Sequence, residues 1–205
     1  MLRGPMRPMA DSGPTVKIDP TRIAFDFDGV VADTMGLFIE MAREIHGIDT
    51  LRYEEITSYN LYESLDIDAD VLFDLSCRII DGPYPMPLKP IKGSLRILKR
   101  LAGYQQPLLF ITARPHVGPI EKWLYQETGL GQGRLEIVAT GDYAPKAEEL
   151  LRRGMTHFVE DRLETCFHLA EKGLCPIVFK QPWNRSEHPF TGVTDWGELE
   201  QLIDF

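Results

Sequence analysis

The 205-residue chain has little cysteine, little positive charge and no long apolar run, and each shortage excludes a class of protein. Its three cysteines form no CxxC pair, which argues against a zinc site or a disulfide framework and favours reduced, mostly buried thiols in a cytoplasmic protein. No apolar run approaches the ~20 residues of a membrane helix, and residues 1–20 lack the apolar segment of a secretory signal. A net charge of −9 disfavours nucleic acid polymers and anionic membranes as partners, although a small phosphorylated substrate could bind at a local cationic site.

What is present is the composition of one folded domain with a modest insertion. Hydrophobic residues make up 43% of the chain and aromatic residues 10%, which is enough for a core. Residues 1–20, rich in Pro, Gly and Met, predict a loosely ordered lead-in. Apolar runs predict strands at 21–28, 107–112, 135–139, 156–159 and 176–179. Helical periodicity and capping signals predict helices at 34–46, 68–80, 94–103, 118–127, 145–153, 163–172 and 195–203.

These elements predict an α/β fold. Strands without polar alternation, each separated from the next by one helix, are typical of a doubly wound, Rossmann-like parallel sheet with helices on both faces. The proline-rich run 82–90 cannot be regular structure, so we interpret it as a linker that returns to the core. The predicted core therefore comprises residues 21–33 and 91–205, and residues 34–90 form a small helical insertion after the first strand.

Polar side chains follow every predicted strand. Because ligands of open α/β sheets bind beyond the carboxyl ends of the strands, these residues are expected to meet at one edge. The first strand leads into Asp26 and Asp28, which alternation would place on one side of the strand. The later strands lead into Thr112 to Pro115, into the segment before Lys146, into Glu160 and Asp161, and into the loop that contains Asn184.

Each of these residues also has an ordinary structural explanation. Asp28 and Gly29 could form a turn, Thr112 is a β-branched residue that suits a strand end, and Glu160 or Asp161 could cap the next helix. Lys146 could be a solvated surface lysine, although a cation in the first turn of a helix opposes the helix dipole. As a set, however, several carboxylates at one edge would repel one another unless a cation is bound.

Four short motifs carry a family resemblance from about residue 22 onward. DFDG, ITARP, PKAEEL and VED, in this order and on these element types, resemble the haloacid dehalogenase-like hydrolase superfamily. Within it, FDFDGVVADT, the ARP after Thr112, VEDR and the loop QPWNR are similar to the 5′(3′)-deoxyribonucleotidase-like branch. One departure is the acidic pair Glu160-Asp161, which stands where that branch commonly has two aspartates, and it leaves the role of Glu160 open.

The resemblance implies a Mg²⁺-dependent phosphomonoesterase. Asp26 would be the nucleophile that forms an aspartyl-phosphate, and Asp28 would be the acid and base, with a raised or coupled pKa. Mg²⁺ would be held by the carboxylates of Asp26 and Asp161 and the backbone carbonyl of Asp28. Thr112 and Lys146 would bind the phosphoryl group. The further expected substrate or loop contacts are Ala113, Arg114 and Asn184. An aspartate at position 28 argues against a dehalogenase.

The insertion is expected to form a cap over the site. Its candidate specificity residues are Phe38, Tyr53, Tyr59 and Tyr62, since an aromatic face can stack on a base or sugar, whereas Phe73 is expected to pack inside the cap. A nucleoside monophosphate is the leading substrate, and a sugar phosphate or phosphoglycolate-type metabolite is the alternative. A non-catalytic nucleotide-binding protein and a phosphotransferase are alternatives of other classes. The sequence does not indicate the oligomeric state.

Overall fold

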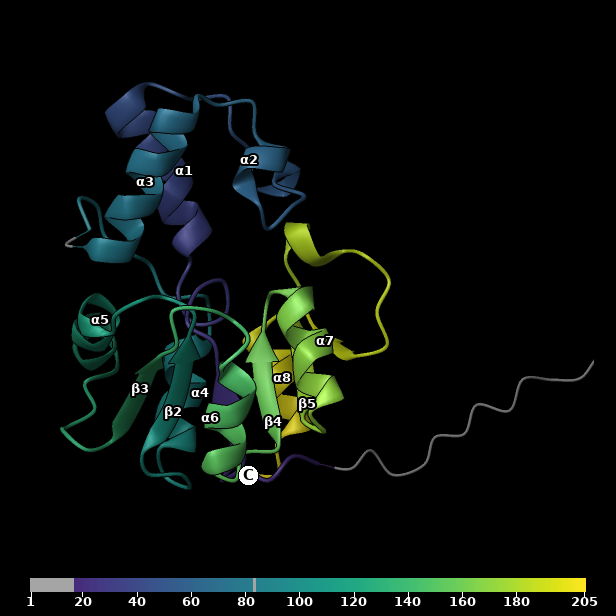
Figure 1. Ribbon diagram of the computed structural model, residues 1–205. Coiled ribbons are helices and arrows are strands. Elements are labelled where there is room, and N and C mark those ends of the chain that lie inside the picture. The colour runs from purple at the N-terminus through teal and green to yellow at the C-terminus, as the bar shows by residue number, and fades with distance from the viewer. Residues whose placement is uncertain (1–16, 83) are drawn as a thin grey trace, which may run out of the picture.

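The core of the protein is a six-stranded parallel sheet in the order β3-β2-β1-β4-β5-β6 (Figure 1). The computed structural model describes residues 17–82 and 84–205. The strands are β1 (Ile23–Phe25), β2 (Leu108–Thr112), β3 (Leu135–Ala139), β4 (His157–Glu160), β5 (Cys175–Phe179) and β6 (Thr191–Val193). The predicted α/β architecture is therefore confirmed.

Two groups of helices surround or overlie this sheet. In the inserted segment they are α1 (Thr34–His46), η1 (Tyr53–Glu55), α2 (Leu61–Ser64) and α3 (Ala69–Asp81). In the core they are α4 (Ser94–Leu101), α5 (Gly118–Thr128), α6 (Lys146–Arg152), α7 (Leu163–Glu171), η2 (Pro182–Asn184) and α8 (Trp196–Leu202). Among the core helices, α5 joins β2 to β3 and α7 joins β4 to β5, which are neighbouring strands, whereas α6 joins β3 to β4 across β2 and β1. Parallel strands need such crossover connections.

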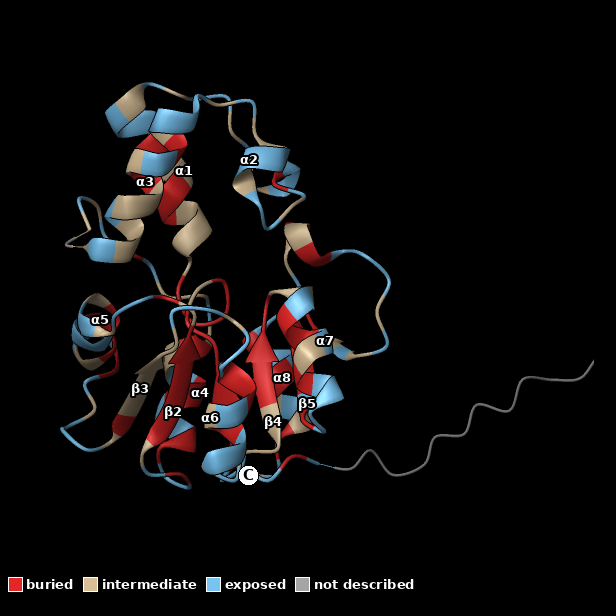
Figure 2. Cartoon of the chain, in the orientation of Figure 1, coloured by how far each residue is buried: buried red, intermediate tan, exposed pale blue. Residues whose placement is uncertain are grey.

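Successive residues of each central strand point to opposite faces, and two separate apolar clusters result. Phe25, Phe110 and Val159 belong to the larger cluster, which also contains the inner faces of α4, α5 and α8. Ala24 and Phe158 belong to the smaller cluster, beneath α6 and α7. Figure 2 shows the central strands and the inward helix faces as buried. This two-sided burial explains why the strand sequences lack polar alternation.

The inserted segment joins the core through two adjacent backbone stretches. Asp33 N–H donates to the Lys89 carbonyl at 2.8 Å, and Ile91 N–H donates to the Val31 carbonyl at 2.9 Å. α1 begins where the Asp33 carboxylate accepts from Gly36 N–H, and it ends at Gly47, whose φ of 68° is left-handed. α1 packs beside α3, and both lie beyond the carboxyl edge of the sheet (Figure 1). We propose that this segment acts as the cap.

Several expectations need correction. β1 ends at Phe25, before the two aspartates, although Asp26 N–H still donates to the Val159 carbonyl at 2.9 Å. β6 was not expected, because a three-residue edge strand that contains glycine carries almost no pattern. The short helices η1 and α2 lie in residues 50–65, where the sequence patterns predict no helix. Ile18, in the segment expected to be loose, is buried and bridges Ile203, whereas residues 1–16 lie outside the described residues.

Two predictions of burial are also wrong. Phe73 is 65% exposed on the outer side of α3 instead of packing inside the cap. Among the cysteines only Cys166 is buried; Cys77 is half-buried and Cys175 is exposed at the start of β5. Both errors arise because residue type predicts burial less well than position on a strand or helix does. Among the described residues, no helix is both long and apolar enough to span a bilayer.

Candidate active site

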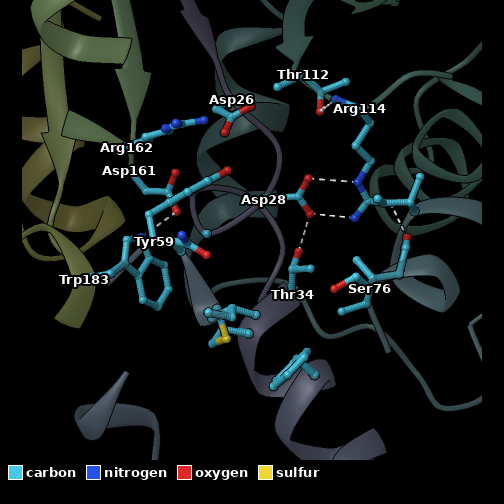
Figure 3. A pocket seen from close by; sticks show the side chains of 18 of the residues that line it. Asp26, Asp28, Thr34, Tyr59, Ser76, Thr112, Arg114, Asp161, Arg162 and Trp183 are labelled. Carbon is cyan, nitrogen blue, oxygen red and sulfur yellow. Dashed lines mark hydrogen bonds and ion pairs between the residues drawn. The ribbon is translucent and has the colours of Figure 1, made fainter. Parts of the chain in front are cut away.

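A cavity of about 720 Å³ lies where the carboxyl edge of the sheet meets the inserted segment (Figure 3). The sheet contributes predicted site residues from three strand ends, which are Asp26, Asp28, Thr112, Ala113, Arg114 and Asp161. The inserted segment contributes three of its four predicted aromatic residues, which are Phe38, Tyr59 and Tyr62. Thr112 is buried at the end of β2, and its hydroxyl accepts from Arg114 N–H at 3.2 Å. The topology thus brings together residues that are up to 135 positions apart in the sequence, as between Asp26 and Asp161.

Asp26 lies in a buried ion-pair cluster. Lys146 Nζ, at the first residue of α6, is 3.0 Å from Asp26 Oδ1 and 2.8 Å from Glu160 Oε2. Burial, and then the charge of Glu160, raise the pKa of Asp26 to about 8 despite the lysine. Burial alone would lower the pKa of Lys146, but the two carboxylates hold it above its ordinary value. Lys146 is therefore a buried counter-ion and not a solvated surface lysine.

Asp161 completes a buried acidic set. One carboxylate oxygen each of Asp26, Glu160 and Asp161 lie within 4.8 Å of one another. Burial, and next the charge of Glu160, raise the pKa of Asp161 well above its ordinary value. Its Oδ1 is buried without a hydrogen-bond partner among the described residues. An orphan oxygen beside other carboxylates fits a hard divalent cation such as Mg²⁺, which takes oxygen ligands only.

Glu160 has a different position from Asp161. Its Oε1 accepts the backbone N–H groups of Asp161 and Arg162, each at 3.1 Å, and its Oε2 accepts from Lys146. Both oxygens therefore have protein partners, unlike Asp161 Oδ1. Glu160 holds the lysine and the turn after β4.

Asp28 has partners that differ from those of Asp26. Arg114 Nη2 is 2.6 Å from Asp28 Oδ1 and Arg114 Nε is 2.9 Å from Oδ2, so the pair is bidentate (Figure 3). The Thr34 hydroxyl donates to Oδ1 at 2.5 Å. Burial opposes ionisation, but Arg114 overcomes it and holds the pKa of Asp28 below its ordinary value. The expected raised pKa of Asp28 is therefore wrong for this arrangement.

Arg114 and Asn184 make structural contacts. Besides Asp28, Arg114 Nη1 donates to the Ile79 carbonyl at 2.6 Å and to the Tyr84 hydroxyl at 3.0 Å. Four of the five guanidinium N–H groups are thus engaged, which leaves little capacity for substrate. Asn184 does not line the cavity; its Nδ2 donates to the carbonyls of Asp161 and Phe179 at 2.7 and 2.9 Å. Asn184 accordingly fits the loop-ordering alternative.

The predicted cap aromatics divide into three positions. Phe38 is buried and lines the cavity. Tyr59 extends across it, and the Arg162 guanidinium lies 4.6 Å from the centre of its ring (Figure 3). Tyr53 does not line the cavity, and its hydroxyl donates to Gln181 Oε1 at 3.0 Å.

Three further residues contact the site although no sequence pattern marks them as site residues. They are Thr34, Gln181 and Trp183. Gln181 Nε2 donates to the Gly29 carbonyl at 2.7 Å, and Trp183 Nε1 donates to Asp161 Oδ2 at 3.1 Å. All three lie inside the motifs FDFDGVVADT and QPWNR, which offered a signal, but a motif does not specify which side chain turns inward.

The chain matches a protein-family model over residues 20–205. The matching family is described as 5′ nucleotidase, deoxy (pyrimidine), cytosolic type C protein. No curated protein sequence matches the chain.

Solved structures match over almost the whole fold at low identity. A dehalogenase in an intermediate complex has a TM-score of 0.60 at 16% identity, covering 91% of this chain and 98% of its own. A haloacid dehalogenase-like hydrolase from Streptococcus pneumoniae has a TM-score of 0.59 at 11% identity, with 89% and 98% covered. CbbY from Rhodobacter sphaeroides, solved with xylulose 1,5-bisphosphate, has a TM-score of 0.56 at 18% identity, with 89% and 98% covered. At these identities the likeness shows the fold alone.

Proposed function

Because the chain belongs to the 5′-nucleotidase, deoxy (pyrimidine), cytosolic type C family and is a phosphomonoester hydrolase, we propose that it hydrolyses nucleoside monophosphates with Mg²⁺ through an aspartyl-phosphate on Asp26. The observation that supports this most is the buried set of Asp26, Lys146, Glu160 and Asp161, of which Asp26 and Asp161 line the cavity. We also propose a cytoplasmic location, because the family is described as cytosolic.

Asp26 is the proposed nucleophile. Its carboxylate attacks phosphorus as the bond to the leaving oxygen breaks, and the resulting acyl phosphate is then hydrolysed by water. Lys146, 3.0 Å from Asp26 Oδ1, offsets the negative charge that gathers there. The carboxylates of Asp26 and Asp161 and the carbonyl of Asp28 would hold Mg²⁺, which when bound offsets charge on the phosphoryl oxygens.

Asp28 is the proposed proton carrier. It is the cavity carboxylate that neither pairs with Lys146 nor belongs to the acidic set of Asp26, Glu160 and Asp161. It would give a proton to the departing alkoxide and later take one from the attacking water. Since its oxygens accept from Arg114 and Thr34, this role requires one of these contacts to open in the reaction.

The size and lining of the cavity favour a nucleotide over a smaller metabolite. The inserted segment contributes an apolar wall that includes Met35, Phe38, Leu61, Ile79 and Ile80. A phosphoglycolate-type substrate has no apolar part for this wall, whereas a base and sugar would cover it.

The test is a panel of nucleoside monophosphates, sugar phosphates and phosphoglycolate with Mg²⁺, for the wild type and Asp26→Asn. We expect turnover of a nucleoside monophosphate and its complete loss in the variant. The control is Asp66→Asn, the same chemical change at an exposed residue of the inserted segment, which should keep wild-type rates. Preferred turnover of a sugar phosphate would refute the nucleotide assignment, and activity in Asp26→Asn would refute the nucleophile. Formation of a phosphorylated acceptor when free nucleoside is added would instead identify a phosphotransferase.

A further inference from the structure

The inserted segment touches the core loop after β5 through η1 and η2. The Tyr53 hydroxyl donates to Gln181 Oε1 at 3.0 Å, and the ring centres of Tyr53 and Trp183 are 5.8 Å apart. Glu54 and Arg185 form an exposed ion pair across the same contact. Figure 1 shows the part of the inserted segment around α2 facing the yellow segment that follows β5. This contact is one place where the cap meets the core next to the acidic set.

The same two core residues also contact the catalytic strand end and the acidic set. Gln181 Nε2 donates to the carbonyl of Gly29, directly after Asp28, at 2.7 Å. Trp183 Nε1 donates to Asp161 Oδ2 at 3.1 Å (Figure 3). Asn184 holds η2 against the sheet, since its Oδ1 accepts from Gln181 N–H at 2.9 Å while its Nδ2 donates to the Asp161 carbonyl. Two short paths therefore join Tyr53 to the site.

The indole fixes which oxygen of Asp161 is available. Because Trp183 engages Oδ2, the carboxylate is held with Oδ1 buried and without a hydrogen-bond partner among the described residues, in a side chain that has one oxygen within 4.8 Å of an oxygen of Asp26 and of Glu160. Gly29 makes room for this arrangement, since a Cβ there would lie 2.1 Å from Asp161 Oδ2 and 3.2 Å from Trp183 Cζ2. A hydrogen-bond donor behind a ligating carboxylate sets the orientation of that ligand.

We propose that Trp183 and Gln181 are positioning residues, and that docking of Tyr53 on them couples the cap to the orientation of the Asp161 carboxylate and thereby to Mg²⁺ affinity. The proposal rests on the proposed function, because it takes Asp161 as a Mg²⁺ ligand. Trp183 acts on Asp161 directly, whereas Tyr53 acts only through Gln181 and the indole ring.

The test is calorimetric Mg²⁺ binding to Trp183→Phe, Tyr53→Phe and the double variant, beside the Mg²⁺ dependence of turnover. Trp183→Phe keeps a ring against Tyr53 but removes the donor, and we expect about a tenfold weaker Kd for Mg²⁺, with kcat at saturating Mg²⁺ within about threefold of wild type. Tyr53→Phe should weaken the Kd about threefold, as loss of one hydrogen bond gives. Because both act along one path, the double variant should be weaker than wild type by less than the product of the single effects.

The matched control is Glu54→Gln, which breaks the exposed ion pair of the same contact and should leave Mg²⁺ affinity unchanged. An unchanged Kd in Trp183→Phe, or equal weakening in Glu54→Gln, would overturn the proposal while the hydrolase assignment stands. If Trp183→Phe does not fold, as its circular dichroism would show, Tyr53→Phe decides alone, and an unchanged Kd there overturns the coupling. A wild-type protein that turns over substrate but binds no Mg²⁺ would refute the metal site itself, which is a different failure.

Discussion

Substituting Gly29 by alanine separates backbone strain from damage to the acidic set. Gly29 has a φ of 69°, a conformation that costs an L-residue about 1–2 kcal/mol. The added Cβ would also lie 2.1 Å from Asp161 Oδ2 and 2.9 Å from its Cγ. Ordinary van der Waals contact begins at 3.4 Å, so the Asp161 carboxylate must move away from the added Cβ by about 1 Å. Trp183 Cζ2, which lies 3.2 Å from that Cβ, limits the directions in which the carboxylate can move. A displacement of about 1 Å can cost 100-fold in rate.

The control is Gly47→Ala, because Gly47 has a φ of 68° with nothing within 4 Å of the added Cβ. It therefore carries the same strain at the end of α1, away from the cavity. In a chain of this size 1 kcal/mol shifts the Tm by about 2–4 °C, so we expect each variant to lose about 2–8 °C in a thermal melt. Only Gly29→Ala should lose about 100-fold in kcat/KM with a nucleoside monophosphate and Mg²⁺. If its kcat/KM stayed within threefold of that of Gly47→Ala, the close approach to Asp161 would have no catalytic importance.

Three further substitutions or additions test the buried charges and the core. Lys146→Met leaves Asp26 and Glu160 buried without their cation, so urea unfolding should show about 3–5 kcal/mol less stability; a loss below 1 kcal/mol would contradict the buried cluster. Trp196→Phe removes the indole donor of the Val30 carbonyl at 2.8 Å, which should cost about 1–3 kcal/mol in the same assay, and no loss would mean that the carbonyl finds another donor. Mg²⁺ at 100 times its Kd should raise the wild-type Tm by about 5–10 °C. It should leave Asp161→Asn unchanged, and an equal rise there would place the ion elsewhere.

The sheet could be predicted because its signals are local. β3 was predicted at its observed bounds, and α1 was as well, since Asp33 and Gly47 mark its two ends in the sequence. The convergence of Asp26, Asp28, Thr112 and Asp161 on one cavity follows from parallel topology alone, because every strand then ends at the same edge. No knowledge of side-chain conformation is needed for that step.

The partners of these residues could not be predicted, because they depend on side-chain directions. Arg114 follows β2 in a segment expected to contact substrate, yet it turns to Asp28 and the last turn of α3. Trp183 would suit a core position by type, and only the tertiary structure shows its N–H directed at Asp161. The motifs identify these residues, but they do not specify the direction in which each side chain points.

The charges at the cavity give a physical reason why one divalent ion fits this site. Four carboxylates lie in or next to it, those of Asp26, Asp28, Glu160 and Asp161. Lys146 pairs with Asp26 and Glu160, and Arg114 pairs with Asp28. A third cation, Arg162, also lines the cavity but pairs with Glu164. When all four carboxylates are ionised, as a bound cation would favour, these pairs leave two negative charges uncompensated, which one Mg²⁺ would balance. Among the described residues, Asp161 Oδ1 is buried without a hydrogen-bond partner, and Asp26 Oδ1 has only its ion pair with Lys146, so the excess is local to these two carboxylates. Arg114 alone could not relieve it, because it is committed to Asp28 and to the cap. Without a bound cation, no interaction would offset the free energy needed to remove those two charges from water.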